Sequence, residues 1–274
     1  MASRRCLVSG PVPVSDSWAS GQSYESYVGG WSRLVAAAFV ERLDVPPGAR
    51  WLDVGSGTGA LTEAVLGFSA PELVVGVEPS AAFREYAEAR VPDPRASFRP
   101  GDAENLPVGD GDLDVVVSGL VLNFVPDRAA ALAEMRRAAR PGGTVAAYVW
   151  DYPGEMQLVN YFWDTAIALD PAARPLHEGI RFDFCRPEPL RALFADAGLR
   201  DVAVAPVVVP VEFASFHEYW SPFLLGTGPA PAYAMSLGEE DRAALREAIR
   251  ARLPAADDGS VHLTARAWAV RGTV

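Results

Sequence analysis

The sequence contains no lysine, and all 24 basic residues among its 274 are arginine. Schiff-base chemistry, pyridoxal phosphate anchoring and the G-x-x-x-x-G-K-[ST] phosphate loop are therefore excluded, because each requires a lysine amine. With 35 acidic residues, the formal net charge is −11. Such a charge repels a polyanion, so nucleic acid is not expected as a partner.

Cysteine, histidine and long apolar runs are also scarce. The two cysteines, Cys6 and Cys185, are too few for a disulfide framework, and neither has a nearby second thiol for a zinc site. The three histidines lie far apart without a paired ligand motif, so no metal is expected. No uninterrupted run of about 18 apolar residues occurs, as a membrane span would require. These absences predict a cytoplasmic protein that does not span a membrane.

Short apolar runs alternate with segments of helical spacing. The run 73–77 is nearly continuous, which is typical of a strand covered on both faces of a parallel sheet. Strands are expected at 50–54, 73–77, 96–98, 114–118, 144–150, 201–209 and 261–270. Helices are expected at 30–43, after Gly59, at 80–90, after a cap at Asp127, and from Pro189 to Gly198. This alternation predicts an α/β fold with helices on both faces of a mostly parallel sheet.

The chain length suits one large α/β domain or two small ones. Residues 1–23, rich in Ser, Gly and Pro, are expected to form a disordered tail. Residues 24–274 are interpreted as a single domain with an N-terminal cap at 24–48. Two insertions, at about 151–187 and 211–260, are expected to pack as helical lids over the carboxyl edge of the sheet. Within the second, the pattern from Ser236 to Glu239 resembles a capping box and predicts a helix start.

Three glycines in five positions follow the first predicted strand, at Gly55, Gly57 and Gly59. Glycines allow a sharp turn and close approach to a ligand, and the next helix presents its N-terminal amides there. Glu78 ends the second strand, where its carboxylate can accept both hydrogen bonds from a ribose diol. Ligands of open parallel sheets bind at this edge. The spacing predicts nucleoside recognition, the alternative being a tight turn beside a solvated acid.

Four segments follow one another in a defined order. They are Asp53-Val54-Gly55-Ser56-Gly57-Thr58-Gly59, the acid Glu78, Gly101-Asp102-Ala103-Glu104-Asn105-Leu106-Pro107, and Arg140-Pro141-Gly142-Gly143. Together they resemble the motifs of class I S-adenosylmethionine-dependent methyltransferases, over about residues 25–205. The type 11, ubiquinone-biosynthesis-like small-molecule branch is the most similar. The resemblance implies a Rossmann-like, doubly wound sheet of seven strands, mostly parallel with the last strand antiparallel.

The resemblance also implies S-adenosyl-L-methionine as cofactor and S-adenosyl-L-homocysteine as product. The glycine loop with Ser56 would lie against the methionine part, and Asp53 near its amino group. Glu78 would hold the ribose hydroxyls, and Pro79 would flank the sugar or the adenine.

Further roles follow from the same resemblance. Asp102 would accept from the adenine amino group, the Ala103 amide would face a ring nitrogen, and Leu120 would lie near the sulfonium. An ordinary turn acid at Asp102 and plain core at Leu120 are the alternatives. In similar enzymes the chain before the first strand folds over the cofactor, so Tyr27, Trp31 and Arg33 are candidates there. For Trp31 and Arg33 the alternatives are helix core and a solvated surface position.

A methyl acceptor that carries a proton needs a general base. His177 and His217 are weak candidates, because both positions also suit surface or packing residues. The substrate is expected to be bordered by the segments after the fourth and fifth strands and by the second insertion. The candidates there are Asn123, Phe124, Asp151, Tyr152, Tyr219 and Trp220. The two insertions are aromatic and apolar, and such walls suit a small aromatic or apolar metabolite. We expect this metabolite to be methylated at O, N or C and to belong to specialised metabolism.

Two other functions fit parts of the sequence. A nicotinamide-dependent oxidoreductase would carry G-x-G-x-x-G, whereas Ala60 and Leu61 stand here where the third glycine should fall. A catalytically inactive adenosyl-binding module of the same fold is the other. A protein or RNA substrate is the alternative to a small molecule, and the acidic balance disfavours it. The sequence does not define the oligomeric state.

Overall fold

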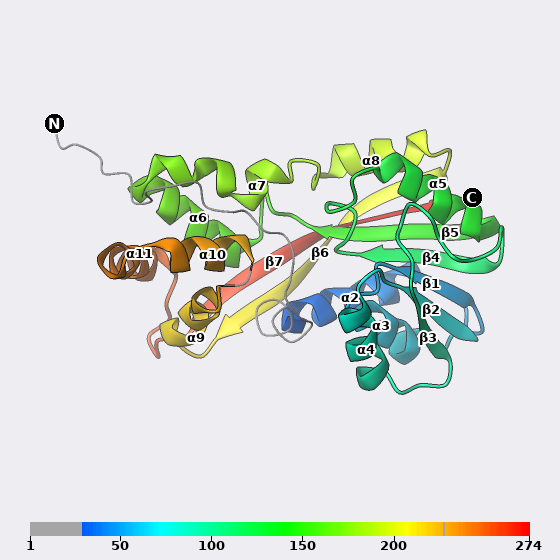
Figure 1. The fold of residues 1–274 in the computed structure, drawn as a ribbon, viewed down its shortest axis with the longest axis horizontal. Coiled ribbons are helices and arrows are strands. Elements are labelled where there is room, and N and C mark those ends of the chain that lie inside the picture. Colours follow the sequence, from blue (N-terminus) through cyan, green and yellow to red (C-terminus); the bar gives the residue numbers. More distant parts are fainter. Residues whose placement is uncertain (1–28, 227) are drawn as a thin grey trace. The chain divides into compact units, whose positions relative to one another are not determined.

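The computed structural model describes residues 29–226 and 228–274. Seven strands form one sheet in the order β3-β2-β1-β4-β5-β7-β6 (Figure 1). The strands are β1 (Arg50–Val54), β2 (Leu73–Val77), β3 (Ala96–Arg99), β4 (Leu113–Gly119), β5 (Ala139–Trp150), β6 (Arg200–Phe213) and β7 (Val261–Thr273). The pairs β1–β2, β1–β4, β2–β3 and β4–β5 are parallel, whereas β5 and β7 are antiparallel. The predicted seven-stranded, mostly parallel sheet with an antiparallel last strand is confirmed.

The central strands are apolar because helices or loops cover both of their faces. In β1 and in β2 the last four residues are buried. One of these buried residues, Asp53, carries a carboxyl group. It lies opposite Gly76 of β2 and Val117 of β4. The strand order reverses between β1 and β4, so the carboxyl ends of β1, β2 and β4 meet at the switch point where ligands bind in such sheets.

Helices cover the sheet, and all but the first of them connect one strand to a later one. They are α2 (Gly30–Leu43), α3 (Ala60–Phe68), α4 (Ala81–Arg90), α5 (Arg128–Ala138) and α8 (Pro187–Asp196). Helices α3 and α4 lie on one side of the sheet and α5 and α8 on the other, as right-handed crossovers require (Figure 1). The predicted cap of α5 is confirmed, because the Asp127 side chain accepts a hydrogen bond of 3.0 Å from the Ala130 amide.

The chain divides into two compact units. The sheet unit comprises the described residues of Val28–Trp150, together with Phe184–Val207 and Ala267–Val274. The aromatic unit comprises Asp151–Asp183 and Val208–Arg266. The expectation that residues 24–274 form one domain, with lids at about 151–187 and 211–260, stays a prediction, and the expected tail at 1–23 lies outside the described residues.

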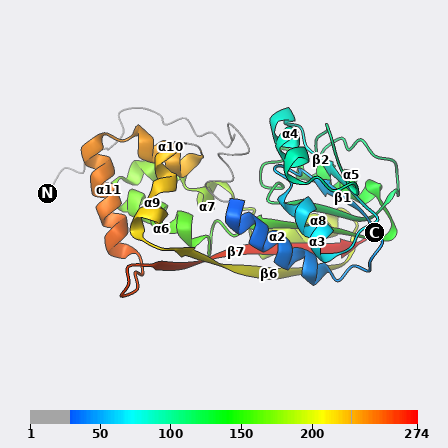
Figure 2. The same cartoon turned by 90° about the horizontal axis from the view of Figure 1, so that it is seen from below.

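The aromatic unit contains parts of β6 and β7 and the following helices: α6 (Gln157–Leu169), η2 (Pro171–Leu176), α7 (Glu178–Arg181), α9 (Phe216–Trp220), η3 (Ser221–Leu224), α10 (Pro229–Ser236) and α11 (Glu239–Arg252) (Figure 2). Rings from three of these helices form its core. Phe162 stacks on Phe223 at 4.7 Å between ring centroids, and Tyr233 lies 5.4 Å from Trp163. All four rings are buried, so aromatic packing holds this unit together.

One local prediction was wrong in part. The helix predicted from the pattern Ser236–Glu239 is present as α11, but it begins at Glu239 with Gly238 as its N-cap. Ser236 instead ends α10, and its hydroxyl donates to the Tyr233 carbonyl at 2.7 Å. The strand predicted at 144–150 begins earlier, because β5 starts at Ala139 and pairs there with Leu113.

No helix within the described ranges is long and apolar enough to cross a membrane. Nor do the described side chains include a cluster of three His, Cys, Asp or Glu residues placed to hold a metal ion.

Candidate cofactor site

The loop after β1 turns sharply back along the sheet. The Gly55 and Ser56 amides both donate to the Val77 carbonyl of β2, at 2.8 and 3.0 Å. Gly55 has a φ of +72°, and a Cβ there would stand 2.6 Å from Val121 Cγ2. Only glycine therefore permits both this conformation and the contact with the loop after β4. The result is an open backbone surface at the carboxyl end of β1.

Glu78 ties this loop to the end of β2. One carboxylate oxygen, Oε2, accepts from the Gly57 amide at 3.1 Å, and Oε1 accepts from the Ser80 amide at 2.9 Å. The residue is only 7% exposed, and burial raises the pKa of its carboxyl. Each carboxylate oxygen has a second lone pair, so the group still has acceptor capacity for a pair of hydroxyl groups.

Asp53 is a buried carboxyl with half of its acceptor capacity unused. Oδ2 accepts from the Thr62 hydroxyl of α3 at 2.7 Å. Oδ1 is buried, and no residue within 29–226 or 228–274 donates a hydrogen bond to it. Burial raises the pKa of Asp53 from 3.8 to about 7. Because a buried acceptor without a donor is costly, a donor from outside the described residues would relieve that cost.

A cavity of about 320 Å³ opens beside Gly55 and Glu78. Its lining residues come from the ends of β1 and β2, the loop after β3 and the loop after β4: Gly55, Glu78, Pro79, Asp102, Ala103, Glu104, Val121, Phe124, Val125 and Pro126. Asp102 is exposed, and its Oδ1 accepts from the Glu104 amide at 2.9 Å. The cavity therefore combines an acidic side with an apolar one, as an aromatic base attached to a sugar requires.

Leu120 holds the loop after β4 in a strained conformation. Its φ is +61°, a left-handed value that is rare for a side chain of this kind. The Leu120 amide donates to the Tyr148 carbonyl of β5 at 2.8 Å, which fixes the turn. The next residue, Val121, lies against Gly55 and lines the cavity. Strain of this kind tends to occur at functional sites, here at the switch point of the sheet.

The fold and this geometry define a class of protein: a doubly wound α/β protein with a candidate ligand site at its switch point. A family model described as a methyltransferase domain matches residues 52–147. A demethylmenaquinone methyltransferase of Roseiflexus sp. (strain RS-1) is 34% identical over 172 residues, which cover 58% of this chain and 72% of that protein. The corresponding protein of Roseiflexus castenholzii is 32% identical over 184 residues, covering 63% and 75%.

Solved structures share the fold at low identity. A putative methyltransferase from an antibiotic biosynthesis pathway of Anabaena variabilis superposes with a TM-score of 0.58 at 21% identity, covering 88% of this chain and 97% of that one. Phosphoethanolamine N-methyltransferase 2 of Haemonchus contortus, solved with S-adenosyl-L-methionine, gives 0.56 at 17% identity, covering 91% and 56%. The chain belongs to the class I S-adenosylmethionine-dependent methyltransferases, and S-adenosyl-L-methionine is its cofactor.

The site residues fit this cofactor chemically. Asp53 Oδ1, to which no described residue donates, has the chemistry to accept from an ammonium group, although Asp53 is not among the described residues that line the cavity. The bare backbone at Gly55 leaves room for close approach. The described residues that line the cavity include no basic one, so this lining favours a cationic ligand over the diphosphate of a nicotinamide cofactor. The family assignment likewise sets aside the oxidoreductase and the inactive module.

The remaining candidates from the sheet unit are placed as follows. Ser56 is buried, and its hydroxyl has no hydrogen-bond partner in the part of the chain that the structure describes. The same holds for Nδ2 of Asn123, which is 4% exposed, whereas Phe124 is 43% exposed and lines the cavity. Trp31 and Arg33 lie half-buried in α2. Tyr27 lies outside the described residues.

The candidates from the aromatic unit are mostly engaged in packing or capping. Tyr219 and Trp220 are buried, and the Tyr219 hydroxyl donates to the Leu158 carbonyl at 3.0 Å. Tyr152 lies against Phe182, with ring centroids 5.3 Å apart. Asp151 is paired with Arg266 at 2.5 Å.

The two histidine candidates for a general base also belong to this unit. His177 is half-buried, and its Nδ1 accepts from the Gly179 amide at 2.9 Å, which caps α7; burial lowers its pKa. His217 is exposed on α9.

Sequence reasoning missed residues that act through position alone. Val121, Val125 and Pro126 line the cavity, and Thr62 holds Asp53. Glu104 also lines the cavity, although the sequence indicated it only as part of a motif. Glu104 and Val121 lie in the loops that follow β3 and β4. Their position after these strand ends was the signal in the sequence that could have pointed to them.

Proposed function

We propose that this methyltransferase acts on a small aromatic or apolar molecule, at an O, N or C atom. The observation that carries the proposal is the charge of the cofactor cavity, whose charged lining among the described residues consists of the acids Glu78, Asp102 and Glu104. The acceptor must approach the cofactor bound there, and these acids would repel a phosphate-bearing acceptor while no described lining residue offers it a cation. An uncharged aromatic or apolar acceptor meets no such repulsion.

The two Roseiflexus relatives, named demethylmenaquinone methyltransferases, direct the choice of test substrate. Their name implies a quinone ring that receives a methyl group. We extend this to the present chain as a proposal, with a reduced naphthoquinone as the model acceptor. Cytoplasmic location and a role in specialised metabolism are parts of the same proposal.

When bound, S-adenosyl-L-methionine supplies a methyl group already activated by a sulfonium. The task of the chain is then to hold an acceptor atom in line with the S–CH₃ bond and to exclude water. Asp53 and Glu78 would fix the amino acid and ribose ends of the cofactor. The rigid turn at Leu120 and Val121 would define the position of the methyl group between them. No metal is needed for such a displacement, and His177 and His217 stay weak candidates for proton removal.

The test is an assay with methyl-deuterated S-adenosyl-L-methionine and three acceptors: a reduced naphthoquinone without its ring methyl, a simple phenol, and phosphoethanolamine. Mass spectrometry detects labelled products. We expect label in the naphthoquinol or the phenol and none in phosphoethanolamine. The Glu78→Ala variant should lose the transfer, and Glu72→Ala, at an exposed site on the sheet unit, should retain it. Transfer to phosphoethanolamine in preference to both apolar acceptors would contradict the proposal.

A further inference from the structure

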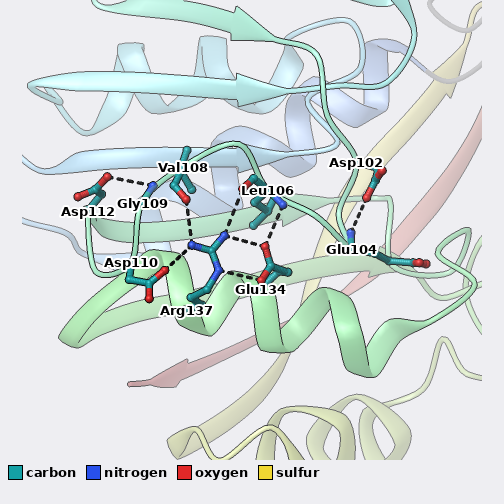
Figure 3. A network of polar contacts seen from close by, with 9 residues as sticks. All are labelled: Asp102, Glu104, Leu106, Val108, Gly109, Asp110, Asp112, Glu134 and Arg137. Carbon is teal, nitrogen blue, oxygen red and sulfur yellow. Dashed lines mark hydrogen bonds and ion pairs between the residues drawn. The ribbon is translucent and has the colours of Figure 1, made fainter.

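The loop between β3 and β4 carries Asp102 and Ala103, two of the lining residues of the cavity. It has little regular structure of its own and is held by side chains of α5 (Figure 3). Arg137 donates to the Val108 carbonyl at 2.9 Å and to the Leu106 carbonyl at 3.1 Å. Glu134 accepts from the Leu106 amide at 2.9 Å and pairs with Arg137 at 2.7 Å. The second half of the loop is therefore fixed to the last turns of α5.

The first half of the loop has a different attachment. Glu104 Oε1 accepts from the Asp127 amide at 3.0 Å. Asp127 is the N-cap of α5, and its amide is one of the groups at a helix start that the helix itself does not satisfy. A carboxylate at this end is also favoured by the helix dipole. Glu104 thus fixes the first half of the loop to the start of the same helix.

This contact joins the two walls of the cavity. Glu104 directly follows Asp102 and Ala103, and Asp127 directly follows Phe124, Val125 and Pro126, all of which line the cavity. The loop after β4 is itself fixed, because Arg128 donates to the Leu122 carbonyl at 2.9 Å and stacks over the Phe184 ring at 4.5 Å. With the loop after β4 held by these contacts, the Glu104 contact ties the first half of the loop after β3 to it.

We propose that Glu104 is a positioning residue for the adenosine part of the cofactor: by accepting from the Asp127 amide it holds Asp102 and Ala103 at the distance from the loop after β4 that the nucleoside needs. The proposal rests on the placement of the adenosine in this cavity. Glu104 is exposed and needs no contact with the base itself. Its effect is preorganisation, which lowers the entropy lost on binding.

The test compares three variants by calorimetric titration with two ligands, S-adenosyl-L-homocysteine and 5′-methylthioadenosine, which lacks the amino acid end. Glu104→Ala removes the acceptor, Glu104→Gln keeps an oxygen in its place, and Glu104→Asp is too short to reach the amide. Glu72→Ala is the matched control. We expect Ala and Asp to raise the Kd of both ligands by the same factor, about tenfold, as for loss of one hydrogen bond to a charged acceptor. Gln should fall between the parent and Ala, because an amide oxygen keeps the hydrogen bond but not the charge that the helix start favours.

Hydrogen exchange supplies a second readout in the absence of ligand. The amides of 102–105 should exchange faster in Glu104→Ala and at the parent rate in Glu104→Gln, while those of 106–110, held by Arg137, should not change. Unchanged Kd values in Glu104→Ala would overturn the proposal. So would equal weakening by Gln and Ala, since the charge and not the contact would then matter.

A parallel titration of Glu78→Ala separates this inference from the proposed site. If Glu78→Ala and Glu104→Ala both bind like the parent, the adenosine does not occupy the cavity and both proposals are wrong. If only Glu78→Ala weakens binding, the site stands and the positioning role of Glu104 is wrong.

Discussion

Two of the buried aspartates, one from each unit, differ in whether a cation neutralises them. Asp53 of the sheet unit is 1% exposed and Asp151 of the aromatic unit 3%. Asp151 Oδ2 accepts from the Glu155 amide at 3.1 Å and from Arg266 at 2.7 and 2.5 Å. Among the described residues, Asp53 has only the Thr62 hydroxyl, on Oδ2, and no cation. A buried carboxylate that its own unit neutralises is structural, whereas one without a counter-charge is a candidate to accept from a cationic ligand.

The largest effect is expected on stability, when the buried Asp151 loses its partner Arg266. Arg266→Met should lower the free energy of unfolding by about 2–4 kcal/mol, because Asp151 would stay buried without a counter-charge. Urea unfolding followed by circular dichroism measures the change. The control is Arg252→Met, at an exposed position near the end of α11, which should shift stability by less than about 0.5 kcal/mol. Equal shifts in the two variants would show that the ion pair is not structural.

The ligand site of the sheet unit is tested first at Glu78. Glu78→Ala should weaken binding of S-adenosyl-L-homocysteine by about 1.5–3 kcal/mol, the range for hydrogen bonds to a charged group. Titration calorimetry gives the affinity, with Glu72→Ala as the matched exposed acid. An affinity equal to that of the parent would place the ribose elsewhere.

Asp53 should make cofactor binding depend on pH. Its pKa of about 7 means that much of it is protonated at neutral pH, whereas a bound ammonium group favours the carboxylate. Affinity for S-adenosyl-L-homocysteine should therefore rise with pH below the pKa, by at most about tenfold per pH unit, and level off above it. Asp53→Asn should remove this slope.

5′-Methylthioadenosine serves as the control ligand for this slope, because it has no amino group. Its affinity should not vary through the titration of Asp53 in either protein. A slope shared by both ligands would mean that Asp53 does not face the ammonium.

The same shift also affects folding. The pKa of Asp53 is raised in the folded state above its ordinary value of 3.8. The folded protein therefore binds the proton more tightly than the unfolded chain does. The contribution of Asp53 to stability is present below about pH 4 and is lost as the pH rises through about 7. The free energies of unfolding of the parent and Asp53→Asn should agree at low pH, where both side chains are neutral. They should diverge as the pH rises through about 7, where the parent loses stability. The reverse pattern is expected only if the asparagine introduces a new contact.

The smallest effect is expected at His177, whose Nδ1 acts as a helix cap. His177→Asn should change stability by less than about 0.5 kcal/mol, because asparagine is itself a good N-cap. Methyl transfer should be retained. A large loss of activity in a variant of parental stability would instead identify His177 as the proton acceptor.

The sheet unit was more predictable from sequence than the aromatic unit, for a physical reason. Parallel strands buried on both faces give continuous apolar runs such as 73–77, and the turn at Gly55 requires glycine, so both leave a local signal. A helical lid was expected at about 151–187, but the bounds of α6 within it were not predicted, although Leu158, Phe162 and Thr165 are buried along it with helical spacing. Its aromatic residues suggested a substrate wall, whereas four buried rings in this unit form a core.

Contacts between distant segments left no local signal. Neither the hydrogen bond from Thr62 to Asp53 nor that from the Asp127 amide to Glu104 can be read from spacing, because each depends on how crossovers bring loops together. The strained Leu120 is similar, since its conformation is imposed by the Tyr148 carbonyl of a neighbouring strand.

A crystal structure of the complex with S-adenosyl-L-homocysteine tests the central claim most directly. The account predicts the amino group hydrogen-bonded to Asp53 Oδ1 and the ribose hydroxyls on Glu78. It also predicts the adenine between Asp102 and the apolar loop after β4. A ligand bound elsewhere, with Asp53 Oδ1 still without a donor, would contradict it.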